Sequence, residues 1–127
     1  MTRQAISTTN APAAVGPYSQ AIIAGDLIFC AGQGAIDPAP QDLRHGTVEE
    51  ETERTLRNLE AVLDAAGATF ADVVKTTVFL ADINDFAAMN EVYAGFFPDP
   101  PPARTTVEVA ALPKGFKVEI EAIARRP

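Results

Sequence analysis

Arg104 and two glutamates near the C-terminal end have the types and spacing to recognise a small carboxylic acid. In ARTTVEVA, Arg104 shares one face of an extended chain with Thr106 and Glu108, and in FKVEIEAIA the same holds for Glu119 and Glu121. A planar guanidinium binds both oxygens of a carboxylate, and a carboxylate can orient or deprotonate a water molecule. If the two strands pair across the LPKG turn, an arginine and a glutamate line one surface. The pattern does not choose between the two glutamates, and a surface salt bridge is the alternative.

The other reactive groups are isolated in the sequence. The one histidine, His45, lies in a polar loop without a partner for a zinc site, which favours a solvated loop residue. The one cysteine, Cys30, lies in the apolar run LIFCAG, which is typical of a buried strand residue. There is no P-loop and no GxGxxG motif, and GQGA at 32–35 is typical of a strand end or bulge. No metal or cofactor is therefore predicted.

The composition bounds the class of protein. The chain has 127 residues, of which 47% are hydrophobic, and suits one domain over 1–127. Its net charge is −7 and its longest basic cluster is Arg125-Arg126, which argues against nucleic acid or an anionic membrane as partner. No run reaches the length of a signal peptide or a membrane span, so we expect a cytoplasmic protein.

The periodicity predicts the elements that must position these groups. Amphipathic helices are expected over 47–67, beginning with a capping box of Thr47 and Glu50, and over 83–97. A polar loop is expected at 36–46. Strands are predicted at 3–7, in both halves of 19–33 around a Gly25-Asp26 turn, in 71–82, from Arg104 onward and in 116–126.

Without the short segment 3–7, which could be a first strand, the order is ββαβαββ, which is typical of an α+β domain. Two helices cover about one face of such a sheet. The runs AIIA, LIFCA and VVKTTVFL scarcely alternate, however, and strands that are apolar on both faces need cover on both. We therefore expect the second face to meet another subunit in a homo-oligomer.

Several segments together resemble the RidA/YjgF family of reactive-intermediate deaminases. They are GPYSQA (16–21), FCAGQ (29–33), TLRNLEAVLDAAG (55–67), VVKTTVFLADINDFAAMNEVYAGFF (73–97), PPART (101–105) and LPKGFKVEIEAIA (112–124). The resemblance covers about residues 3–125. It implies a chorismate-mutase-like fold with one mixed sheet, two helices on one face, and a homotrimer with sites in clefts between subunits.

The same resemblance implies a reaction. Family members hydrolyse 2-imino acids and enamines, such as 2-aminoacrylate and 2-iminobutyrate, to 2-keto acids and ammonia without a cofactor or metal. These substrates are released by pyridoxal-phosphate dehydratases acting on serine and threonine. By resemblance, Arg104 binds the substrate carboxylate, and Glu119 rather than Glu121 positions the water.

Four further residues match the family's substrate-binding positions. Tyr18 matches an aromatic residue at the cleft, Asn90 a polar pocket residue on the second helix, and Gly32 a position whose backbone amide faces the ligand. Thr106 stands where some members have cysteine, so no thiol acts there. Phe86, on the apolar stripe of the same helix as Asn90, is expected in the core.

Three other functions remain open at this stage. One is deamination of a longer enamine or imino acid such as 2-aminomuconate. Another is a non-enzymatic small-carboxylate-binding or chaperone-like module that uses the same clefts. The third is ribonuclease activity, attributed to some relatives, which the acidic charge and the lack of a basic patch disfavour.

Overall fold

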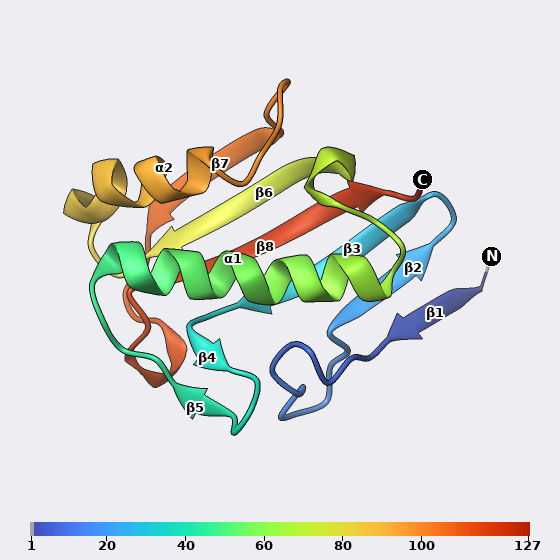
Figure 1. The fold of residues 1–127 in the computed structure, drawn as a ribbon, viewed down its shortest axis with the longest axis horizontal. Helices are drawn as coiled ribbons and strands as arrows, with labels where there is room; N and C mark the ends of the chain where they lie inside the picture. The colour runs from blue at the N-terminus through green and yellow to red at the C-terminus, as the bar shows by residue number, and fades with distance from the viewer. Residues whose placement is uncertain (1) are drawn as a thin grey trace.

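The computed structural model describes residues 2–127 and has an α+β architecture with one main sheet (Figure 1). The six strands lie in the order β1-β2-β3-β8-β6-β7. β6 and β7 pair in parallel, whereas the other neighbours pair antiparallel, so the sheet is mixed. The strands are β1 (Arg3–Ile6), β2 (Ala21–Ala24), β3 (Leu27–Gln33), β6 (Val73–Leu80), β7 (Ala103–Glu108) and β8 (Val118–Arg125).

Both helices, α1 (Val48–Ala65) and α2 (Phe86–Ala94), cover the same face of this sheet (Figure 1). α1 begins with the predicted capping box, in which Thr47 Oγ1 accepts from the Glu50 N–H and Glu50 Oε1 accepts from the Thr47 N–H. These bonds satisfy two N–H groups that a helix start leaves open. The predicted α+β class, with two helices on one face of a mixed sheet, is confirmed.

Shorter elements connect the strands and helices. The segment predicted as a polar loop contains a small ribbon of β4 (Ile36–Asp37) and β5 (Asp42–Leu43). Single 3₁₀ turns occur at η1 (Phe70–Asp72), η2 (Ile83–Asp85) and η3 (Pro113–Gly115). Within residues 2–127, neither helix combines the length and apolar character needed to cross a bilayer.

The core lies between the helices and the sheet. It holds the buried alternate residues of the central strands, such as Ile28, Val78 and Ile120, against Leu56 and Leu59 of α1. The core also holds the Cys30 side chain, as predicted, and burial raises the pKa of its thiol to about 12. A thiol that stays protonated is a poor nucleophile.

The opposite face of the sheet has no helix over it. Phe29 is 43% exposed there, and its register partner on β8 is Ile123. Glu119 and Glu121 lie on the same face, because their partners on β6 are Phe79 and Thr77 rather than the buried residues. The face is thus partly apolar and partly acidic, and the homotrimer expected to cover it remains a prediction.

The strands from Arg104 and in 116–126, whose pairing across the LPKG turn was one possibility, do not pair, because β6 lies between β7 and β8. The connection at 109–117 passes the end of β6. The Val109 N–H donates to the Leu80 carbonyl on one side of that end, and the Ala81 N–H donates to the Lys117 carbonyl on the other. A connection of this length can skip one strand, whereas a tight hairpin turn cannot.

Candidate functional site

Arg104 lies on the helix-covered face of the edge strand β7. Its register partner on β6 is Thr76, which is fully buried, so both side chains point toward α2. The guanidinium carbon lies 4.8 Å from the centroid of the Tyr93 ring and 5.4 Å from that of Phe86. The Tyr93 hydroxyl in turn shares a 2.6 Å hydrogen bond with Thr76 Oγ1. Two rings and a buried hydroxyl pair therefore position the cation.

The Arg104 guanidinium forms no ion pair with any of residues 2–127. Its contacts with the aromatic rings involve the π-faces and need none of its N–H donors. The donors at the edge of the guanidinium therefore remain available for a bidentate interaction with a carboxylate.

Two unsatisfied polar atoms lie on the same side of the sheet. Asn90 follows Phe86 by four residues and precedes Tyr93 by three, so these three side chains share one face of α2. Thr106 follows Arg104 by two residues and shares its strand face. Asn90 Oδ1 and Thr106 Oγ1 are both buried without a hydrogen-bond partner. Buried polar atoms are normally bonded, so each of these two atoms is available to a ligand or to a water molecule.

The other predicted residues surround a cavity of about 250 Å³ where β3 ends and β8 begins. Tyr18, Gly32 and Glu119 all line it. Its remaining walls are mostly apolar and come from three segments, namely Pro12, Ala13, Val15 and Gln20, then Gln33, Gly34 and Ile36, and then Pro113, Lys114 and Phe116. The Tyr18 side chain is 53% exposed and forms part of the rim.

Two glycines allow the walls of this cavity to approach each other. A Cβ atom on Gly32 would collide with the Glu119 carboxylate, and one on Gly34 would collide with the Phe116 ring. The β3–β8 register also shifts between Cys30 and Gln33, which confirms the predicted strand irregularity at GQGA. The absence of a side chain at Gly32 and Gly34 therefore leaves room for the Glu119 carboxylate and the Phe116 ring in their observed positions.

The Glu119 carboxyl is only partly accessible. Burial, with a smaller contribution from the charge of Glu121, raises its pKa above the usual range of a glutamate. A carboxylate with a raised pKa is a stronger base, which suits it to accept a proton from water. Glu121 is exposed on the same strand and does not line the cavity.

Within one chain, Arg104 and Glu119 do not converge. Arg104 pairs with Thr76 on the helix-covered face, whereas Glu119 pairs with Phe79 on the open face. The prediction that an arginine and a glutamate line one surface is therefore wrong for a single chain. The structure instead groups Arg104 with Asn90 and Thr106, which we call the arginine half-site, and Glu119 with Tyr18 and Gly32, which we call the glutamate half-site.

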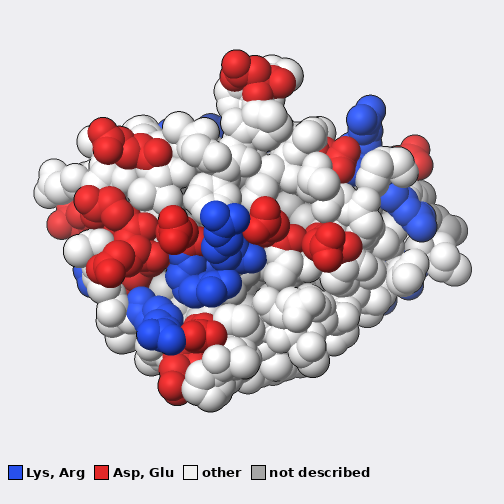
Figure 2. Space-filling view, in the orientation of Figure 1, with Lys and Arg blue, Asp and Glu red and all other residues white. Residues whose placement is uncertain are grey.

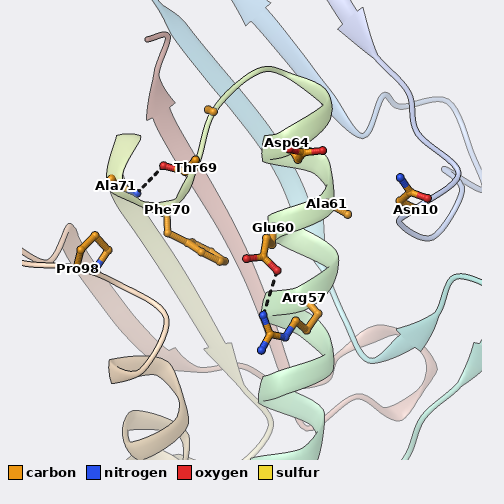
Figure 3. Close-up of a pocket in the computed structure, with 10 residues that line it drawn as sticks. Asn10, Arg57, Glu60, Ala61, Asp64, Thr69, Phe70, Ala71 and Pro98 are labelled. Carbon is orange, nitrogen blue, oxygen red and sulfur yellow. Dashed lines mark hydrogen bonds and ion pairs between the residues drawn. The ribbon is translucent and has the colours of Figure 1, made fainter.

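A larger cavity of about 550 Å³ contains none of these residues. It lies between the C-terminal half of α1 and η1 (Figure 3). Its cation, Arg57, is paired with Glu60 at 3.1 Å, and Asp64 adds a further negative charge. Such a surface is poorly suited to an anionic ligand. Residues 2–127 also contain no cluster of His, Cys, Asp and Glu that could hold a metal ion.

Phe86 packs against the core, as predicted, but its ring also lies against Arg104, a contact that was not predicted. The contact of the Tyr93 ring with Arg104 was not predicted either. The spacing of both residues from Asn90 was the available signal. His45 is a half-exposed loop residue, as predicted, and its Nδ1 lies 3.9 Å from Glu51 Oε2.

The chain belongs to the family described as endoribonuclease L-PSP, which matches residues 8–126, and the RidA/YjgF resemblance is thereby confirmed. The RutC family protein y4sK of Sinorhizobium fredii is 56% identical over 118 residues, covering 93% of this chain and 94% of that protein. A 2-iminobutanoate/2-iminopropanoate deaminase of Capra hircus is 53% identical over 124 residues, covering 98% and 90%. The crystal structure of E. coli TdcF with bound serine is 42% identical, with a TM-score of 0.92 and coverage of 98% and 99%.

Proposed function

We propose that this protein hydrolyses 2-imino acids and their enamine tautomers, such as 2-aminoacrylate and 2-iminobutyrate, to 2-keto acids and ammonia. The observation that carries the proposal is the Arg104 guanidinium, which lies against two rings and forms no ion pair within residues 2–127. A planar guanidinium that is held in place and has no acidic partner can bind the two carboxylate oxygens of such a substrate. Several mammalian relatives carry the name of this deaminase, which supports the assignment.

The proposed site is completed between subunits of a homotrimer. β7 is an edge strand, so the arginine half-site lies at the border of the chain. The glutamate half-site has an exposed rim at Tyr18. Placing the first half-site of one subunit against the second of its neighbour would bring Arg104 and Glu119 to one ligand, and a cyclic assembly repeats this contact at every interface.

The proposed mechanism needs only positioning and proton transfers through Glu119. Arg104 binds the carboxylate and fixes C2 of the imine next to a water molecule. The Glu119 carboxylate takes a proton as the water oxygen bonds to C2 and passes it to the imine nitrogen, which becomes the amine of a carbinolamine. Glu119 then takes the proton of the carbinolamine hydroxyl as the C=O bond of the keto acid forms, and gives it to the nitrogen as the C–N bond breaks and ammonia leaves. No metal or cofactor takes part.

In the cell, the proposed substrates come from pyridoxal-phosphate dehydratases that act on serine and threonine. A cytoplasmic deaminase beside these enzymes would remove reactive imines before they modify other proteins. Ribonuclease activity is the weaker alternative. On the face seen in Figure 2, the Lys and Arg side chains are interrupted by Asp and Glu and form no continuous basic surface for phosphates.

A second candidate function is non-enzymatic binding of a small carboxylate. The solved structure of TdcF contains serine, an amino acid whose carboxylate has the same chemistry as that of an imino acid. Both candidates predict binding at Arg104. Turnover distinguishes them, because a binding module leaves the rate of imine hydrolysis unchanged.

The test is a coupled assay in which a dehydratase generates 2-aminoacrylate or 2-iminobutyrate and keto-acid formation is followed. We expect acceleration by the wild type and its loss in Arg104→Ala. Arg57→Ala is the matched control, because Arg57 also lies over an aromatic ring, Phe96, at 4.7 Å, but is paired with Glu60. Equal activity of Arg104→Ala and wild type would contradict the mechanism. Acceleration with 2-aminomuconate alone would replace the substrate by the longer enamine.

A further inference from the structure

The buried face of α1 carries a row of polar side chains. Glu51, Thr55 and Asn58 recur at intervals of four and three residues and therefore share one helix face. Each is 0% exposed. Burial of a carboxylate or an amide costs free energy unless the group is bonded, so the contacts of this row need an explanation.

Asn58 holds one wall of the glutamate half-site. Its Nδ2 donates to the carbonyl oxygens of Gly34 at 3.0 Å and Ile36 at 2.8 Å, which uses both of its hydrogens. Gly34 and Ile36 line the cavity, and Gly34 is the position that lies against the Phe116 ring. Asn58 itself does not line the cavity.

Glu51 holds the opposite wall. Its Oε1 accepts from the backbone N–H of Lys117 at 3.0 Å, and its Oε2 lies 3.3 Å from Lys117 Nζ and 3.4 Å from the Gly46 N–H. Lys117 directly follows Phe116, which lines the cavity, and precedes Glu119 by two residues. Glu51 is therefore bonded to the backbone directly before β8 begins at Val118.

The sheet is least able to hold the two walls at this place. The β3–β8 ladder shifts its register between Cys30 and Gln33, around the point where Gly32 meets Glu119. A bulge interrupts the regular backbone bonds that otherwise keep neighbouring strands at a constant separation. The bonds from α1 hold both strands just beyond one end of this irregular stretch, at Gly34 and Ile36 after β3 and at Lys117 before β8.

We infer that Glu51 and Asn58 are positioning residues of the glutamate half-site: from the helix layer they set the separation of its two walls and so hold the Glu119 carboxylate over Gly32. Neither side chain touches the ligand. The kinetic test of this inference rests on the proposed function. The second test, a measurement of the Glu119 pKa, rests only on contacts within a single chain.

The experiment compares two test variants with one control. Glu51→Gln keeps the shape but replaces one acceptor by an amide donor, whereas the carboxylate faces donors on both oxygens. Asn58→Ala removes both bonds to the other wall. Thr52→Ala is the control: Thr52 is also 0% exposed, but its hydroxyl donates only to Val48 of its own helix, at 2.6 Å.

Two quantities are measured on each folded variant. In the coupled assay, kcat should fall about tenfold in Glu51→Gln and Asn58→Ala while KM stays near the wild-type value, because Arg104 binds the carboxylate elsewhere. The pKa of Glu119, followed by the NMR shift of its carboxyl carbon, should fall toward the ordinary value as water enters between the walls. Thr52→Ala should change neither quantity, although it should lower Tm.

Each outcome decides the matter. The inference is overturned if both test variants have the same kcat and the same Glu119 pKa as Thr52→Ala. It is also overturned if the Glu119 pKa is unchanged and the loss of kcat only follows the loss of folded protein. Should Asn58→Ala fail to fold, Glu51→Gln against Thr52→Ala decides alone. Absence of deaminase activity in the wild type would refute the proposed function, and the Glu119 pKa would then decide the positioning role without kinetics.

Discussion

The arginine and glutamate half-sites hold opposite charges by different means. Arg104 lies against two aromatic rings, whose faces attract a cation without neutralising it. Glu119 lies over a glycine in a cavity with mostly apolar walls, where burial raises its pKa. Neither side chain has an ion-pair partner among residues 2–127.

This difference shows how a chain can keep two complementary charges available. On one surface and within reach of each other, a guanidinium and a carboxylate form a salt bridge and bind each other rather than a ligand. Here the sheet separates them, because β6 lies between their strands and they face opposite sides. Single substitutions in each half-site can show whether Arg104 and Glu119 depend on these separate means of support.

The largest expected effect is that of Arg104→Lys. The lysine keeps the charge but lacks the two parallel N–H donors of the planar guanidinium, so kcat/KM in the coupled assay should fall about a hundredfold. Arg57→Lys, on α1, should stay close to wild type, because Arg57 is paired with Glu60. Full activity of Arg104→Lys would show that a positive charge is enough to bind the substrate carboxylate and that the bidentate guanidinium contact plays no part.

A smaller loss is expected when the glutamate half-site is disturbed through Gly32→Ala. The new Cβ collides with the Glu119 carboxylate and must displace it, so kcat should fall about tenfold or more. Gly95→Ala is the control, because a Cβ there would lie 3.5 Å from the nearest carbonyl oxygen, an ordinary contact. If Gly32→Ala and Gly95→Ala have equal kcat, the close approach of Gly32 to Glu119 has no catalytic importance.

Tyr93→Phe should affect the arginine half-site mildly. The ring beside Arg104 is kept, while the 2.6 Å hydrogen bond to Thr76 is lost and leaves a buried hydroxyl without a partner. Urea unfolding should show a loss of about 1–3 kcal/mol in the free energy of unfolding. KM should rise only about threefold, since the cation–π contact remains. A KM as high as that of Arg104→Lys would mean that the hydroxyl, not the ring, supports Arg104.

The smallest expected effect is a pH-dependent change of Tm in Glu119→Gln. Because the folded pKa of Glu119 is raised, the folded state holds more protons than the unfolded state between the ordinary and the raised pKa, and stability falls as the pH rises through that interval. Glu119→Gln removes this loss. Its Tm should therefore exceed that of wild type at neutral pH, and the difference should shrink in acid. An equal Tm difference at both pH values would contradict the raised pKa.

Much of the fold could be predicted from local pattern. The capping box at Thr47, the two helices and the central strands follow from spacing that acts within a few residues. The position of β6 between β7 and β8 could not be predicted, because strand periodicity gives the two faces of each strand but not its neighbours.

The candidate site could likewise be predicted only in part from the sequence. Arg104 and Glu119 could be selected as chemically capable residues, but their separation by the sheet is a property of the topology. Glu51 and Asn58 could not be distinguished from a solvated helix face, because their partners are backbone groups at Lys117, Gly34 and Ile36, distant in sequence. Long-range backbone bonding has no signature in a single sequence.

The separation of Arg104 from Glu119 also has a genetic consequence under the proposed assembly. A subunit with Arg104→Ala retains an intact Glu119, and one with Glu119→Gln retains an intact Arg104. Two inactive proteins that are unfolded together and refolded as mixed oligomers should then form some sites with both native residues. Complementation of this kind would reveal a shared site, whereas a site contained within one chain would stay inactive in every mixture.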